Sequence, residues 1–241
     1  METKIDYLCT FYFGRRRCFL TDELYAKNKY TFLKEQVEYL KKYRDQYSEI
    51  LFLINDEGSG DRSIIEKLSN GIRDVKIIYR DNVNLSYGAW QEGLDYLVDN
   101  KLDGDYAFLN EDDYLPIGED FLKPWLAKTD PKTLYVCGLW RQNHASISFG
   151  LLNMNLAKRT NTKKVRFRLP YHTPDNLYKG GIRAQITFLD HYKSFGPHNK
   201  VFKDIMNDHY IRFRDPYLKE VIWGNFETGT EIIKPIDLVK E

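Results

Sequence analysis

The chain has 241 residues, a formal net charge of +1 and 42% hydrophobic residues, enough for one substantial core, so we expect a single globular domain. The near-neutral charge argues against a dedicated nucleic-acid binder, and no apolar run approaches the roughly 18 to 20 residues that span a bilayer. The N-terminus lacks a signal peptide's apolar stretch, and the three cysteines show no CxxC spacing, so we expect a soluble, cytoplasmic protein with reduced thiols.

The first half of the chain alternates between strand and helix patterns. Runs rich in β-branched and aromatic residues predict buried strands at residues 5–13, 49–55, 75–80 and 105–110. Apolar residues at helical spacing lie between them, around residues 30–40, 64–68 and 87–97, and Asp61 or Ser63 is expected to cap the second of these helices. This order predicts an α/β fold, in which helices cover both faces of a mainly parallel sheet.

The second half is less regular. Residues 133–140 and 145–154 are predicted strands, and residues 158–168 form a basic loop or exposed strand. That basic segment could attract an anionic ligand or simply be a solvated surface. Helices are predicted at residues 184–196 and 203–214.

Three consecutive acids, Glu111, Asp112 and Asp113, follow the fourth predicted strand. In parallel α/β sheets ligands bind at the carboxyl ends of the strands, which is where these acids would lie. Adjacent carboxylates repel one another, and a hard divalent ion such as Mg²⁺ or Mn²⁺, which prefers oxygen ligands, would offset that cost. The alternative is an exposed acidic turn before Pro116.

A second polar segment, INDEGSGDRS at residues 54–63, follows the second predicted strand and opens a helix, as a loop around a nucleotide would. A surface turn is the alternative. The spacing of Gly58 and Gly60 does not make a dinucleotide fingerprint, and the sequence contains no GxxxxGK[ST] motif, so neither a Rossmann dehydrogenase nor a P-loop enzyme is supported.

Four stretches in this order resemble the GT-A nucleotide-sugar glycosyltransferases, especially glycosyltransferase family 2. They are CTFYFGR, DEGSGD, NVNLSYGAWQEGLDY and GDYAFLNEDDYLP. The family has, in the same order, a polar and aromatic strand end, a DDGSTD-like loop, a helix start with asparagine and glycine, and an acidic DxD stretch. The resemblance weakens after Pro124. It implies one GT-A-like (Rossmann-like) αβα sandwich over residues 1–241, with a nucleotide-sugar half (1–124) and an acceptor half (125–241).

The resemblance also implies roles for individual residues. Thr10 and Tyr12 would lie against the nucleotide base, and Asp56 would bond its polar edge. Glu111 falls on the first DxD acid and Asp113 on the metal-binding acid. Because the motif here reads E-D-D, Asp112 could be the ligand instead of Asp113 or could share the ion, which would be Mn²⁺ or Mg²⁺. The remaining donor-binding residues implied are Arg15 and Asn84, although residues 15–17 could equally be a solvated arginine run.

An inverting transferase needs a base that removes the proton of the acceptor hydroxyl. Family 2 often carries this base in an ED...R element, and FGPHNKVFKDIMNDHYIRFR at residues 195–214 resembles it. Asp208 is then the candidate base, and Asp190 is its rival. Asn207 replaces the first acid of the pair, and a carboxylate that merely pairs with Arg212 or Arg214 is the alternative.

The function implied is a metal-dependent glycosyltransferase of the hexosyltransferase type. It would move a sugar from a nucleoside-diphosphate donor to a glycan or other hydroxyl acceptor, with inversion, in surface glycan or polysaccharide assembly. One alternative is a catalytically silent domain that binds nucleotide sugars or glycans. Another is a sugar nucleotidyltransferase, which ranks lower because its GxGTRxxPxT-like start is absent.

Overall fold

The computed structural model describes residues 3–13, 30–56, 58, 61–82, 85–112, 114–116, 119, 121–129, 133, 135–141, 144–159, 202–204, 211–213 and 222–223. The alternating order expected for the first half is confirmed. Its elements are β1 (Ile5–Phe13), α2 (Thr31–Tyr43), the 3-10 turn η1 (Arg44–Gln46), β2 (Ile50–Asp56), α3 (Arg62–Ser69), β3 (Val75–Arg80), α4 (Leu85–Asp99) and β4 (Tyr106–Glu111).

The second half adds mostly short elements. They are β5 (Tyr114–Pro116), α5 (Leu122–Ala127), β6 (Tyr135–Arg141), β7 (His144–Asn153), α6 (Met154–Arg159), β8 (Phe202–Asp204), β9 (Ile211–Phe213) and β10 (Ile222–Trp223). The strands expected at residues 133–140 and 145–154 are therefore confirmed as β6 and β7. The helix expected at residues 184–196 and most of the basic segment 158–168 lie outside the described residues.

Seven of the described strands form one mixed, mainly parallel sheet in the order β3-β2-β1-β4-β7-β6-β8. Strands β2 and β4 both pair with β1 in parallel, and β3 pairs with β2 in parallel. Strand β7 runs antiparallel to both β4 and β6. The predicted α/β class is confirmed, and each of the first three crossovers passes through a helix, as parallel pairing requires.

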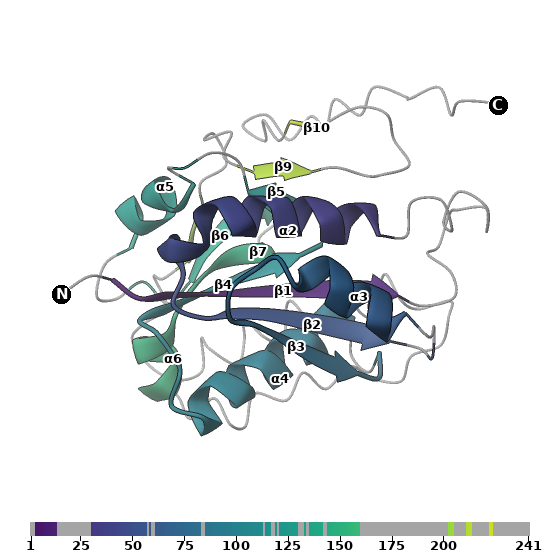
Figure 1. Ribbon diagram of the computed structural model, residues 1–241. Helices are drawn as coiled ribbons and strands as arrows, with labels where there is room; N and C mark the ends of the chain where they lie inside the picture. The colour runs from purple at the N-terminus through teal and green to yellow at the C-terminus, as the bar shows by residue number, and fades with distance from the viewer. Residues whose placement is uncertain are drawn as a thin grey trace, which may run out of the picture.

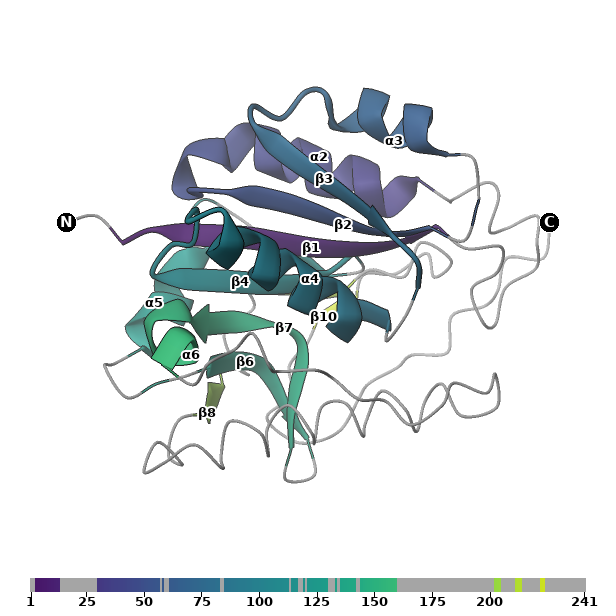
Figure 2. The same cartoon turned by 90° about the horizontal axis from the view of Figure 1, so that it is seen from below.

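Helices cover both faces of this sheet. Helices α2, α3 and α5 lie on one face, and α4 and α6 lie on the other (Figures 1 and 2). Successive side chains of β1 alternate between the two cores: Tyr7 and Cys9 pack on the α2 side, and Leu8 packs on the α4 side. A strand buried on both faces needs apolar residues at nearly every position, which is why every residue of β1 except Asp6 and Thr10 is apolar or aromatic. No helix in the described part of the chain combines the length and apolar character needed to cross a bilayer.

The predicted helix at residues 203–214 is wrong. Residues 202–204 form β8, which extends the main sheet beside β6, and residues 211–213 form β9. Strand β9 pairs antiparallel with β5 and with β10, and these three make a separate small sheet (Figure 1). Pairing with strands distant in sequence overrides the local pattern here, because short apolar runs suit either structure.

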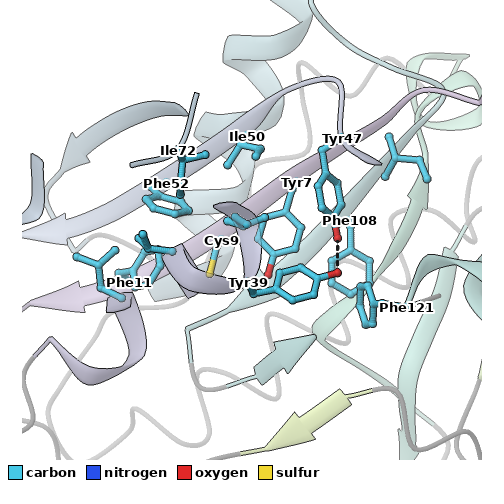
Figure 3. Packing of buried hydrophobic residues seen from close by; sticks show 14 of the residues in the cluster. Tyr7, Cys9, Phe11, Tyr39, Tyr47, Ile50, Phe52, Ile72, Phe108 and Phe121 are labelled. Atoms are coloured by element: carbon cyan, nitrogen blue, oxygen red, sulfur yellow. Dashed lines mark hydrogen bonds between the residues drawn. The ribbon is translucent and has the colours of Figure 1, made fainter. Parts of the chain in front are cut away.

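The core on the α2 side is rich in aromatic rings (Figure 3). Tyr39 and Tyr47 are buried there, and their hydroxyl groups are hydrogen-bonded to each other at 3.1 Å. The ring of Tyr7 lies edge-on to Tyr47, with 5.0 Å between centroids. Burial raises the pKa of Tyr7, Tyr39 and Tyr47, because ionisation would place a phenolate in an apolar core.

These tyrosines predict that the protein loses stability in alkali. In the unfolded chain each tyrosine ionises near pH 10, whereas in the folded protein it stays neutral to higher pH. The contribution of these tyrosines to the free energy of unfolding should therefore be constant below about pH 10 and fall above it by about 1.4 kcal/mol per pH unit for each buried tyrosine. Urea unfolding of wild type and Tyr47→Phe between pH 8 and pH 11 tests this. The variant should show a shallower fall, and parallel curves would contradict the assignment.

Candidate functional site

The carboxyl ends of β1, β2, β3 and β4 meet at one edge of the sheet. The crossovers first move outward from β1 to β2 and β3, and α4 then returns the chain to β4 on the other side of β1. The β1/β4 boundary is thus a topological switch point, where open α/β sheets bind their ligands. In register, Thr10 of β1 lies beside Glu111 of β4, and Tyr12 lies beside Asn55 of β2. The predicted residues Thr10, Tyr12 and Glu111 are therefore brought together at this edge.

A hydrogen-bonded row crosses the strand ends on the α4 side. The Asn55 side-chain amide donates to Thr10 Oγ1 at 3.1 Å, and the Arg80 guanidinium donates to Asn55 Oδ1. Arg80 also pairs through Nε with Glu92 of α4 at 2.9 Å, although its side chain is only 8% exposed. The row places the Arg80–Glu92 ion pair close to the ends of β2 and β3.

The rule that ligands bind at strand ends points, in the sequence, to residues 55–61 and 80–84, which include Asn55 and Arg80. It gave neither side chain a role, and it did not point to Glu92. The available signal was that Asn55 and Arg80 are polar residues at the ends of two apolar strands. Their contact depends on the parallel register that places Asn55 opposite Arg80, and the sequence does not state that register.

The segment after β2 is organised by Asp56. Its Oδ1 accepts a hydrogen bond from the backbone N–H of Gly58 at 3.0 Å, and its Oδ2 lies 3.6 Å from Nε of Arg62. Gly58 has a φ of +77°, in the left-handed region that glycine enters without steric cost. Asp61 immediately precedes α3, as expected for a cap, but its Oδ1 accepts from the hydroxyl of Tyr30 at 2.6 Å and makes no side-chain capping bond. Asp56 thus shapes this segment, and its contact with a base stays a prediction.

The acidic stretch begins where β4 ends. Glu111 is partly exposed, and Asp112 is buried to 8% exposure. The main chain around them is held from both faces of the sheet: Trp90 Nε1 of α4 donates to the carbonyl oxygen of Asn110 at 3.2 Å, and Gln36 Nε2 of α2 donates to that of Asp112 at 3.3 Å. The motif is therefore attached to the fold on both sides.

Several predicted site residues lie outside the described residues. They are Arg15, Asn84, Asp113, Asp190 and Asp208. Their roles stay predictions. Strand β5 begins directly after Asp113, and it pairs with β9, which begins three residues after Asp208 in the sequence.

The chemistry of the donor set can be compared with the needs of a divalent ion. Among the described residues, no group of three or more His, Cys, Asp or Glu side chains is placed to hold a metal. Glu111 and Asp112 do supply two carboxylates at the switch point. Mg²⁺ is commonly held by one or two carboxylates, with water and substrate phosphates completing its shell, so the residues fit an open metal–phosphate site.

The fold and the position of these side chains define a class of protein: an α/β protein with polar and acidic residues gathered at the switch point of a mainly parallel sheet. No protein-family model matches the chain, and no curated protein matches it.

Solved structures that resemble the chain include both glycosyltransferases and cytidylyltransferases. The glycosyltransferase GlyE of Streptococcus pneumoniae has 12% identity and a TM-score of 0.49, and the match covers 86% of this chain and 46% of that one. A cytidylyltransferase from Leptospira borgpetersenii has 14% identity and a TM-score of 0.48, over 84% of this chain and 76% of that one.

The mannosyltransferase PcManGT of Pyrobaculum calidifontis, in complex with GDP-Man and Mn²⁺, has 12% identity and a TM-score of 0.44. That match covers 66% of this chain and 47% of the other, so this chain spans about half the length of the mannosyltransferase. Because identities are this low and all three TM-scores are below 0.5, the functional proposal below rests on the residues of this chain.

Proposed function

We propose that this protein is a metal-dependent glycosyltransferase that moves a sugar from a nucleoside-diphosphate donor to a hydroxyl acceptor. The observation that carries the proposal is the placement of Glu111 and Asp112 at the end of β4, beside Thr10 of β1, at the switch point of the sheet. A strand that ends in carboxylates at this position suits a bound diphosphate and its counter-ion. The motif order that resembles family 2 supports the same assignment.

In this proposal the donor lies across the ends of β1, β2 and β4. Thr10, Tyr12 and Asn55 face its base, Asp56 bonds the polar edge of that base, and Asn84 and Arg15 make further donor contacts. Asp113, with Asp112 as alternative or second ligand, holds Mn²⁺ or Mg²⁺. When bound, the ion would neutralise the charge that develops on the departing nucleoside diphosphate.

The acceptor side of the proposal comes from the second half of the chain. Residues 1–124 form the donor half, and residues 125–241 form the acceptor half. Asp208, or Asp190 in its place, accepts the proton of the attacking hydroxyl, which gives inversion in one displacement. A glycan or another hydroxyl compound serves as acceptor, and surface-glycan or polysaccharide assembly is the setting that we propose.

A thermal-shift screen tests this function. UDP-, GDP-, dTDP- and CMP-sugars are each added with Mn²⁺ or with EDTA. One nucleotide class should raise the melting temperature with Mn²⁺ and by much less with EDTA. The rise should be about 5–10 °C when the donor is present at about 100 times its dissociation constant. No shift with any donor would contradict the proposal.

The products formed from the stabilising donor separate the alternatives. A glycosyltransferase releases nucleoside diphosphate from the donor. The release is slow when water takes the place of the acceptor and faster when the acceptor is present. A silent binding domain gives the thermal shift without that release. A nucleotidyltransferase instead forms a nucleotide sugar from nucleoside triphosphate and sugar phosphate, with release of pyrophosphate.

A further inference from the structure

A chain of buried polar side chains runs through the aromatic core to the acidic motif. Asn110 Nδ2 donates to the hydroxyl of Tyr7 at 2.7 Å, and that hydroxyl donates to Gln36 Oε1 at 2.7 Å. Gln36 Nε2 then donates to the main-chain carbonyl of Asp112 at 3.3 Å. These side chains come from β4, β1 and α2. We call Asn110, Tyr7 and Gln36 the polar relay.

The relay is costly unless every bond in it is made. All three of its side chains are 0% exposed. The ring of Tyr7 stacks on Phe108 with 5.8 Å between centroids, and Tyr7 lies among the apolar and aromatic side chains of this core (Figure 3). A buried amide without a partner is destabilising, whereas an apolar side chain of similar size would fill the same space with no such requirement.

The relay ends on main chain, and this suggests what it does. The hydrogen bond from Gln36 goes to the main-chain carbonyl of Asp112 and not to a carboxylate. It fixes that carbonyl relative to α2. On the other face, Trp90 fixes the carbonyl of Asn110. The main-chain carbonyl groups of the residues before and after Glu111 are thus each hydrogen-bonded to a different helix. Motion of the acidic stretch would have to break one of these buried bonds.

We infer that Gln36, supported by Tyr7 and Asn110, is a positioning residue: it holds the main chain of residues 110–112 so that the carboxylates of Glu111 and Asp112 are presented in one arrangement to a divalent cation and a diphosphate. This inference rests on the proposed function for its ligands, and it assigns Gln36 no contact with them. Replacing a residue that orients metal ligands without contacting the metal commonly lowers metal affinity 10- to 100-fold.

Two variants break the relay, and one serves as a matched control. Gln36→Met is close to glutamine in volume but makes neither hydrogen bond. Tyr7→Phe is milder, because it removes only the hydroxyl between Asn110 and Gln36. Tyr47→Phe removes a hydroxyl from the same aromatic core, where it bonds to Tyr39 and not to the relay. Urea unfolding of all three variants shows that each is folded.

The first measurement is hydrogen exchange of residues 108–116 without any ligand. Exchange there should speed up about five- to tenfold in Gln36→Met and in Tyr7→Phe, relative to Tyr47→Phe of similar global stability. The second is a Mn²⁺ titration followed by electron paramagnetic resonance, with Mn²⁺ alone and with UDP or GDP. The dissociation constant should rise about tenfold or more in Gln36→Met and stay within about twofold in Tyr47→Phe.

Either of two results would overturn the inference: unchanged exchange in residues 108–116, or faster exchange with wild-type affinity for Mn²⁺. The latter would make the relay purely a stability feature. Failure of the proposed function looks different, because wild type itself would then bind no Mn²⁺ with or without nucleotide. In that case the part of the inference that concerns cation binding is also contradicted. The exchange data still decide whether Gln36 holds the main chain of the acidic stretch.

Discussion

Asp113→Ala should reduce donor turnover by at least about a hundredfold while the protein keeps its melting temperature. The expected size follows because loss of an outer-shell partner alone costs 10- to 100-fold, and Asp113 is the proposed metal ligand itself. Turnover is measured as release of nucleoside diphosphate from the donor identified by thermal shift, across a range of Mn²⁺ concentrations. Partial recovery at high Mn²⁺ would indicate that Asp112 shares the ion.

Asp45→Ala is the matched control. Asp45 lies in η1, before β2 begins, and therefore at the opposite end of the parallel strands from the acidic motif. Its side chain is 89% exposed and pairs with Arg73 at 2.7 Å. Exposed pairs contribute little to stability, so this variant should behave as wild type in both assays. Full turnover in Asp113→Ala would contradict the metal assignment, and equal losses in both variants would indicate a general charge effect.

Phe108→Ala should lower the free energy of unfolding by about 3–5 kcal/mol, the range for removal of a buried aromatic ring. Phe108 is fully buried at the centre of β4, and its ring packs edge-on against Phe121 and Trp125 at 5.0 Å from each. It also stacks on Tyr7, so the cavity would open beside the polar relay. In a chain of this length the melting temperature should fall by about 6–20 °C. Urea and thermal unfolding measure the loss.

Ile64→Ala is the control for this loss. Ile64 lies in the first turn of α3, and its side chain is 42% exposed. Its truncation should therefore change the free energy of unfolding by no more than about 0.5 kcal/mol. If Phe108→Ala cost no more than that, the packing of α5 and α2 against β4 would be incorrectly described.

Long apolar and periodic segments were predictable from the sequence. β1 and β3 were expected at their observed bounds, and β2 and β4 were expected to within one residue at each end. β1, β2 and β4 are buried on both faces, and the edge strand β3 is mostly half-buried, so burial and local propensity favour the same structure. The helix predicted at residues 203–214 was wrong because local propensity and long-range pairing favour different structures there. β8 and β9 have only three residues each and gain their stability from partners far away in the sequence.

The positions of candidate site residues were predictable where they follow from position along a strand. Glu111, Asp112 and Thr10 lie at one edge of the sheet, as expected, because the carboxyl ends of parallel strands meet there. Gln36 was not found, because a glutamine within a Lys- and Glu-rich helix has the pattern of a solvated residue. It is in fact fully buried, since it points towards β1 and β4. Contacts such as Asn55 with Arg80 also need the register, which emerges only from the folded sheet.

The pairing of β5 with β9 has a consequence for how this protein is made. Strand β5 follows the acidic motif directly, whereas its partner lies at residues 211–213, far later in synthesis. While the ribosome is still translating the intervening segment, β5 cannot form this pairing, and it is a free edge that can recruit other strands. A nascent chain can thus form the β3-β2-β1-β4 half of the main sheet well before β9 is available to pair with β5 in the small sheet. Slow translation of the intervening segment would prolong the interval in which this edge has no β9 to pair with.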